Sequence, residues 1–98
     1  MTAKLIVFYK APPDPAKFDT YYFETHMPLA QKMPHVNKIE ISRFTGENPP
    51  YYLMATLYFN SPEDREACLN SPEGQAAAAD VSNFASADSV IFAFADVV

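Results

Sequence analysis

Residues 14–34 read DPAKFDTYYFETHMPLAQKMP, and this segment decides the fold. At 3.6 residues per turn, one stripe of the segment gathers most of its large side chains, namely Phe18, Tyr21, Tyr22, Thr25 and Leu29. The opposite side carries Lys17, Thr20 and Glu24, which are typical of a surface in contact with water. The spacing therefore predicts an amphipathic helix whose apolar side docks on another element.

Prolines and one aspartate mark the ends of this helix. Asp14 can cap the first turn, and Pro15 suits the first helical position, where no N–H is needed. Pro28 clashes with the preceding turn and disfavours helical angles at the residue before it. We therefore expect a kink or stop at residues 26–27, followed by one or two further turns. His26 would then lie beside unpaired carbonyl groups at a helix end, where a side chain can hydrogen-bond and titrate.

Length and composition indicate a single domain spanning residues 1–98, and the 49% hydrophobic content is typical of a globular protein. The formal net charge of −5 and the lack of a basic stripe argue against nucleic-acid binding. Cys68 is the single cysteine, which excludes an internal disulfide and fits a reducing compartment. The N-terminal segment lacks a signal-peptide pattern, and no apolar run is long enough to span a bilayer. We expect a soluble, cytoplasmic protein without membrane contacts.

The remaining chain predicts four strands and two more helices. Segments rich in β-branched and aromatic residues predict strands at 4–10, 36–44, 51–60 and 90–97. The Ser-Pro pairs at 61–62 and 71–72 predict helices that end near Asn70 and near Phe84. Within the second helix, the alanines at 76–79 form a small-residue face that can lie close on a sheet. The order β-α-β-β-α-β predicts a ferredoxin-like α+β sandwich, with a four-stranded antiparallel sheet and helices on one face.

Three of the four predicted strands are apolar on both faces, although the helices can cover only one face. An open sheet would therefore expose a large apolar patch to water. A second copy that packs sheet to sheet would cover this patch, so we expect a symmetric homodimer. The alternative is that tyrosines such as Tyr52 and Tyr58 simply face solvent.

Two segments resemble the EthD family, which is named for a protein encoded with an ether-degrading oxygenase system: FDTYYFETHMPLAQKMP from residue 18 and SPEGQAAAADVSNFA from residue 71. The resemblance spans nearly the whole chain and implies a dimeric α/β barrel of two ferredoxin-like halves. The family is grouped with oxidative degradation of small organic molecules. Its architecture is similar to that of cofactor-free monooxygenases, polyketide cyclases and lactone isomerases, in which a cavity lies between helices and sheet and a helix histidine is a common participant.

His26 is the main catalytic candidate. As a general base it could take a proton from an activated carbon or a phenol of a substrate held against Phe18 and Tyr22. Asp19 or Tyr22 would orient the imidazole ring. The alternative is a structural histidine that hydrogen-bonds a backbone carbonyl and fixes the kink before Pro28.

Further candidates surround this histidine in the predicted fold. Tyr21 and Tyr22 fit packing roles better than acid roles, because aromatic side chains at helical spacing usually form core. Asp80 and Asn83 share a helix edge and match the second EthD segment, so they could point into the same cavity; the alternative is a solvent-facing acid and a helix-ending asparagine. His35 stands where the family usually has Gly, which would place a second imidazole near the pocket mouth.

Neither metal nor nucleotide cofactors are expected. The two histidines and Cys68 lack metal-ligand spacing, and neither glycine belongs to a phosphate-binding loop. These features and the resemblance together predict a cofactor-independent, monooxygenase-type oxidoreductase that binds a small hydrophobic organic molecule. One alternative is an isomerase or cyclase that uses the same proton transfer. The other is a non-catalytic protein that binds a hydrophobic ligand and accompanies an oxygenase.

Overall fold

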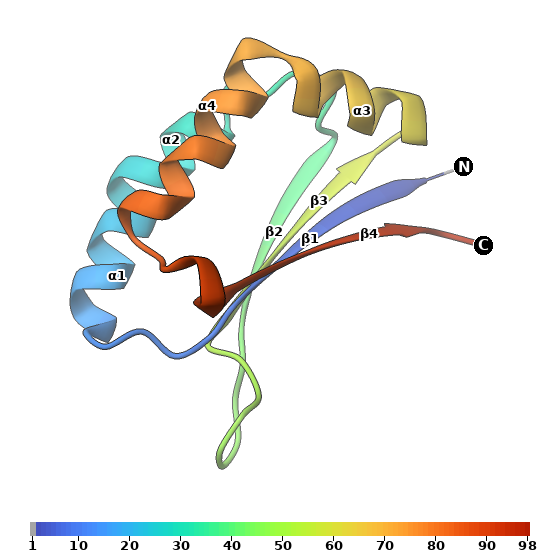
Figure 1. The fold of residues 1–98 in the computed structure, drawn as a ribbon. Coiled ribbons are helices and arrows are strands. Elements are labelled where there is room, and N and C mark those ends of the chain that lie inside the picture. Colours follow the sequence, from blue (N-terminus) through green and yellow to red (C-terminus); the bar gives the residue numbers. More distant parts are fainter. Residues whose placement is uncertain (1) are drawn as a thin grey trace.

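Four antiparallel strands form one sheet in the computed structural model, which describes residues 2–98, and the helices lie on one face of that sheet (Figure 1). The strands are β1 (Ala3–Tyr9), β2 (Lys38–Arg43), β3 (Leu53–Phe59) and β4 (Val90–Asp96), in the order β2-β3-β1-β4. Each strand lies inside the segment predicted for it or differs from it by one residue at an end. The ferredoxin-like fold predicted from the sequence is confirmed.

The two faces of the sheet differ in what covers them. On β1, Leu5, Val7 and Tyr9 alternate with the other residues of the strand, face the helices and are buried. The strand register places a mixed set of side chains on the opposite face, comprising Lys4, Ile6, Phe8, Lys38, Glu40, Met54, Thr56, Tyr58, Ile91 and Ala93. None of the described helices covers this second face (Figure 1).

The helix that carries His26 does not stop at residues 26–27; its regular α-helical part ends earlier, at Tyr21, and the helical path continues. It runs as α1 (Pro15–Tyr21), a π-helical turn η1 (Tyr22–His26) and α2 (Met27–Ala30). In η1 the N–H of Met27 donates to the carbonyl of Tyr22, five residues earlier. This wider turn lets the helical path pass Pro28, whose ring would clash in a regular helix.

The π turn changes which side chains face the core. An α-helix turns by about 100° per residue, and a π turn holds one additional residue. His26 and Ala30 are therefore buried, in the positions that the regular spacing had given to Thr25 and Leu29. Thr25 is exposed and Leu29 is only half-buried.

The second helical segment contains α3 (Pro62–Asn70), α4 (Pro72–Asp80) and two short 3-10 turns, η2 (Val81–Asn83) and η3 (Ala87–Ser89). Ser61 and Ser71 cap the two helices, as predicted, by accepting hydrogen bonds from backbone N–H groups three residues later. At Gly74, a Cβ atom would lie 2.0 Å from the carbonyl oxygen of Cys68, so the two helices meet where only glycine fits. The α-helix ends at Asp80 rather than near Phe84, because the chain tightens into η2.

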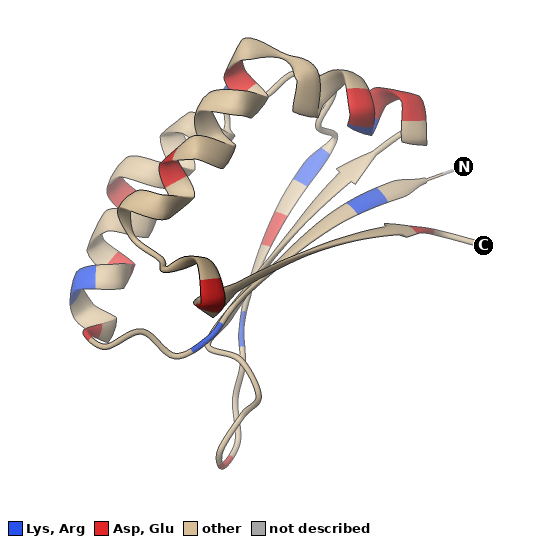
Figure 2. Cartoon of the chain, in the orientation of Figure 1, with Lys and Arg blue, Asp and Glu red and all other residues tan. Residues whose placement is uncertain are grey.

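The alanine face of α4 does not lie close on the sheet as predicted. Ala77 is buried, but Ala76, Ala78 and Ala79 are exposed, and a cavity separates this helix from the sheet. Charged residues of both signs lie on the helices and near the strand ends, and the view drawn contains no basic stripe (Figure 2). None of the described helices is long and apolar enough to cross a membrane.

Candidate active site

His26 and Asp80 form a buried hydrogen-bonded pair between the π turn η1 and the end of α4. His26 Nδ1 lies 2.9 Å from Asp80 Oδ2, and the two residues are 7% and 8% exposed. A carboxylate can only accept hydrogen bonds, so in the neutral imidazole the hydrogen sits on Nδ1 and the lone pair on Nε2. The pair therefore presents Nε2 as a proton acceptor.

Asp80 is held by two further donors on its other oxygen. Tyr21 donates its hydroxyl hydrogen to Oδ1 at 2.7 Å, and the side-chain amide of Asn83 donates to the same atom at 3.0 Å. Burial raises the pKa of the Asp80 carboxyl, but the hydrogen bonds from Asn83, Tyr21 and His26 outweigh burial and hold this pKa below its ordinary value. The carboxylate is therefore ionised at neutral pH, and its hydrogen bonds raise the pKa of Tyr21.

Aromatic rings enclose the imidazole. The His26 ring centroid lies 4.8 Å from that of Phe84 and 5.3 Å from that of Tyr22. Tyr22 stacks on Phe18 and packs edge-on against Tyr9, so these side chains lock one another in place. Burial raises the pKa of Tyr22 and of Tyr9, and both phenols stay protonated.

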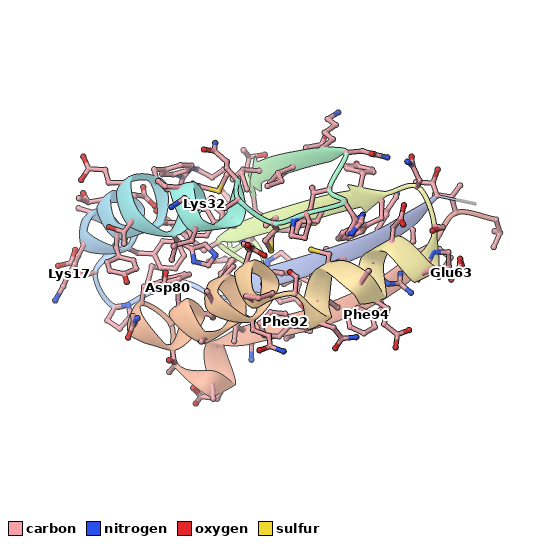
Figure 3. The ribbon with its side chains drawn as sticks, turned by 90° about the horizontal axis from the view of Figure 1, so that it is seen from above. Lys17, Lys32, Glu63, Asp80, Phe92 and Phe94 are labelled. Carbon is pink, nitrogen blue, oxygen red and sulfur yellow. The ribbon has the colours of Figure 1, made fainter. Side chains whose placement is uncertain are left out.

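A cavity of about 300 Å³ lies between the sheet and the helices, and His26 forms part of its wall. Its other lining residues come from every strand and from three helices, and they are mostly aliphatic or aromatic. Among residues 2–98, no hydrogen bond is found to His26 Nε2, and no fully buried side-chain nitrogen or oxygen lacks a partner. Nε2 therefore keeps some accessible surface, and His26 is one of the residues that line the cavity. Seen from above, Asp80 lies on α4, and Phe92 and Phe94 lie along β4 near the helices (Figure 3).

Asp19 does not orient the imidazole, contrary to the sequence prediction. Its carboxylate accepts hydrogen bonds from Tyr52 at 2.8 Å and from Arg43 at 3.3 Å, toward β2 and β3. Tyr22 contacts the ring through its face rather than through a hydrogen bond, and Asp80 is the residue that fixes the ring.

The other predicted residues divide between the cavity and a second depression. Phe18, Tyr21 and Asn83 line an open groove of about 860 Å³ next to α1, so Tyr21 and Asn83 reach Asp80 from the groove side. Asp80 is buried, which excludes the alternative of a solvent-facing acid. His35 has a left-handed backbone (φ 68°), lines neither space, and lies 4.0 Å from Asp64.

Sequence reasoning missed the wall that β4 contributes to the cavity. The sequence places Phe92 and Phe94 only in a strand that is apolar on both faces, and no local pattern distinguishes a cavity wall from ordinary core. The available signal was the pairing of β4 with β1 that the fold implies, because this register sets Phe92 beside Val7 and Phe94 beside Leu5, on the face that carries the helices. Among residues 2–98, no three His, Cys, Asp or Glu side chains gather where a metal ion could be held.

Known proteins resemble this chain in both sequence and structure. The model of the EthD domain matches residues 10–88. An uncharacterized 11.0 kDa protein from the thcB-thcC intergenic region of Rhodococcus erythropolis is 42% identical over 86 residues, which cover 85% of this chain and 84% of that protein. The crystal structure of an EthD family protein from Bacillus halodurans has a TM-score of 0.93 at 30% identity and covers 100% of both chains. SnoaB, a cofactor-independent oxygenase from Streptomyces nogalater, shares the fold at 11% identity, with a TM-score of 0.69 over 98% of this chain and 92% of its own.

Proposed function

This chain belongs to the EthD family, and from the His26–Asp80 geometry we propose that it is an enzyme that moves a proton on a small hydrophobic organic molecule. One observation carries the proposal. His26 lines a mostly apolar cavity and has no hydrogen bond to Nε2 among residues 2–98, while Nδ1 is fixed by an ionised carboxylate. This arrangement suits a general base better than a structural histidine, which would be expected to satisfy both ring nitrogens.

The proposed proton transfer uses each member of the pair differently. His26 takes a proton from the substrate at Nε2, and the positive charge that forms on the ring is stabilised by Asp80 without a second transfer. Tyr21 and Asn83 act on the carboxylate and not on the substrate, because they reach Asp80 from the groove. They are therefore positioning residues.

We propose cofactor-independent oxygenation as the reaction. A methylene group flanked by unsaturated carbons would lose a proton to His26, and the resulting carbanion would transfer electrons to O₂. The hydroperoxide formed after the proton returns would lose water and leave a carbonyl group, so one O₂ yields one carbonyl and one H₂O. A cofactor-independent oxygenase of the same fold supports this choice. Isomerisation or cyclisation remains the second candidate, because either needs only the same proton transfer.

The test compares the two histidines of the chain. Oxygen uptake and product formation are measured with a panel of compounds that carry a methylene group flanked by unsaturated carbons, some of them phenols. His26→Gln should lose turnover by at least about 100-fold. His35→Gln is the matched control and should retain it, because that side chain is exposed and lies outside the cavity. Full activity of His26→Gln refutes the proposal, and product formation without oxygen uptake favours isomerisation. Ligand binding without any turnover supports the accessory role.

We also propose that the protein works as a homodimer in the cytoplasm. The uncovered sheet face supports the dimer, because it contains Ile6, Phe8, Met54 and Ile91 at its centre and along β4. Some polar side chains on this face satisfy one another, since the Tyr58 hydroxyl donates a hydrogen bond to the Glu40 carboxylate at 3.0 Å. The free, buried Cys68 fits a reducing compartment.

A further inference from the structure

Among residues 2–98, no Asp, Glu, Lys or Arg side chain lines the cavity. Three polar side chains, His26, Tyr9 and Tyr22, contribute to it, and the remaining lining residues are apolar or glycine. Tyr9 and Tyr22 are almost fully buried and held by ring packing, and no hydrogen bond is found to His26 Nε2 among residues 2–98, so we take Nε2 as the main hydrogen-bonding atom of the wall. The cavity therefore offers a ligand one polar contact and otherwise apolar surface.

We propose that this cavity selects an uncharged, compact cyclic molecule with a single hydrogen-bonding group, and that Phe92 at the β4 edge limits its size. The proposal rests on the proposed function in that it names the substrate class of the same site. A cavity of about 300 Å³ is at the small end for ligand pockets, which restricts the ligand to about one substituted ring.

An anionic ligand is disfavoured for two reasons. Burial of an unpaired charge is costly, and no lysine or arginine of the described chain, residues 2–98, lines the cavity. The Asp80 carboxylate also lies directly behind the imidazole and repels a second negative charge. An anion could be neutralised there only by protonated His26, which would then lack the lone pair that the reaction needs.

A cationic ligand is disfavoured because the nearest carboxylate is already occupied. Asp80 accepts hydrogen bonds from Tyr21, Asn83 and His26, and the imidazole separates it from the cavity. A bound ammonium group would therefore lose its water shell without gaining a carboxylate partner. An uncharged hydroxyl or carbonyl-activated group has no such cost.

The most exposed rings of the cavity wall lie on β4, which is an edge strand of the sheet. Phe92 and Phe94 are 50% and 64% exposed, although their register partners Val7 and Leu5 are buried. The guanidinium carbon of Arg65 lies 5.0 Å from the centre of the Phe94 ring, and Arg65 also donates to β1 and β4. Phe92 has no ring–ring or cation–ring contact among the described residues. Of the two exposed rings in the wall, Phe92 is therefore the one without a cation–ring contact to hold it.

The charge selectivity is tested with three probes that share one ring: benzyl alcohol, benzylammonium and benzoate. Titration of the wild-type protein at neutral pH is followed by calorimetry and by the NMR signals of the His26 imidazole. We expect benzyl alcohol to bind with a dissociation constant at least about tenfold lower than either ion and to shift the His26 signals. Binding of either ion as tight as that of the alcohol overturns the proposal, and so does the failure of all three to bind.

The size limit is tested with Phe92→Ala and with 1-naphthalenemethanol, a larger neutral alcohol. The substitution should improve binding of the larger alcohol relative to benzyl alcohol by about tenfold, since it removes most of an aromatic side chain. Phe23→Ala is the matched control, because Phe23 is 45% exposed on the helix and lines no part of the cavity. An unchanged ratio in Phe92→Ala, or the same change in Phe23→Ala, overturns the role of Phe92. Both binding tests are independent of turnover, so a failure of the acid–base proposal would leave their outcome unaffected.

Discussion

Substitution of Asp80 by asparagine tests the candidate site most directly. The carboxylate accepts hydrogen bonds at 2.7, 2.9 and 3.0 Å from Tyr21, His26 and Asn83. An asparagine side chain has one acceptor oxygen, and its amide group must face at least one of these donors. A hydrogen bond to a charged group contributes about 1.5–3 kcal/mol, and an unsatisfied buried donor costs about 1–3 kcal/mol. We therefore expect Asp80→Asn to lower the free energy of unfolding by roughly 2–4 kcal/mol at pH 7.

The size of this effect should depend on pH with a defined sign. The folded-state pKa of Asp80 lies below its ordinary value of 3.8, so the unfolded chain takes up the proton first as the pH falls. The stabilisation by the carboxylate is therefore complete above pH 3.8 and is lost as the pH falls through the folded-state pKa. The difference between wild type and Asp80→Asn should be largest at neutral pH and should narrow below pH 3.8.

Urea unfolding followed by circular dichroism measures both the loss of unfolding free energy at pH 7 and its dependence on pH. Asp19→Asn serves as the control, because that carboxylate is partly exposed, and its ion pair with Arg43 should contribute less than about 1 kcal/mol. The NMR signals of His26 give an independent readout, since an amide that faces Nδ1 would move the ring hydrogen to Nε2. A loss of stability below about 0.5 kcal/mol at pH 7, or a loss that does not change with pH, would contradict the described network.

Two further predictions concern packing and assembly. Gly74→Ala should lower the free energy of unfolding by about 1–2 kcal/mol, because a contact of 2.0 Å with the Cys68 carbonyl outweighs the better helix propensity of alanine. Urea unfolding that matches wild type would show that the two helices can separate. Ala76→Gly is the control for helix propensity alone. Ile6→Glu should convert the proposed dimer to monomer by weakening association at least about 100-fold, because it places a charge at the centre of the uncovered sheet face. Light scattering after size exclusion measures the mass, with Phe23→Glu as the control, and a wild-type monomer would refute the dimer itself.

Much of the fold could be predicted because its signals are local. The Ser-Pro pairs before α3 and α4 mark helix starts through caps that need only three neighbouring residues. The strands follow from short runs of β-branched and aromatic residues, and their order restricts the topology. The alanines of α4 do not pack closely on the sheet, because small residues permit such packing but do not require it; here Ala77 and Ala78 line a cavity instead.

The site was predictable only in part. His26 was identified as the main candidate, but its partner Asp80 lies 54 residues away, and no local spacing connects them. Asp19 was chosen because it shares a helix edge with His26 under regular α-helical spacing. The π turn breaks that spacing, and Pro28 was the available sign of it, since a helix that continues through a proline has to rearrange its hydrogen bonds.

Because η1 contains one extra residue, the number of residues in this turn determines where the His26 imidazole lies. Removal of one residue from 22–25 would leave the composition almost unchanged and would retain His26 and the segment that follows it. It would nevertheless rotate that segment by about 100° relative to α1, which swings the imidazole away from α4. In any protein with this fold, a deletion of one residue here would therefore leave the histidine in the sequence but remove its hydrogen bond to the aspartate on α4.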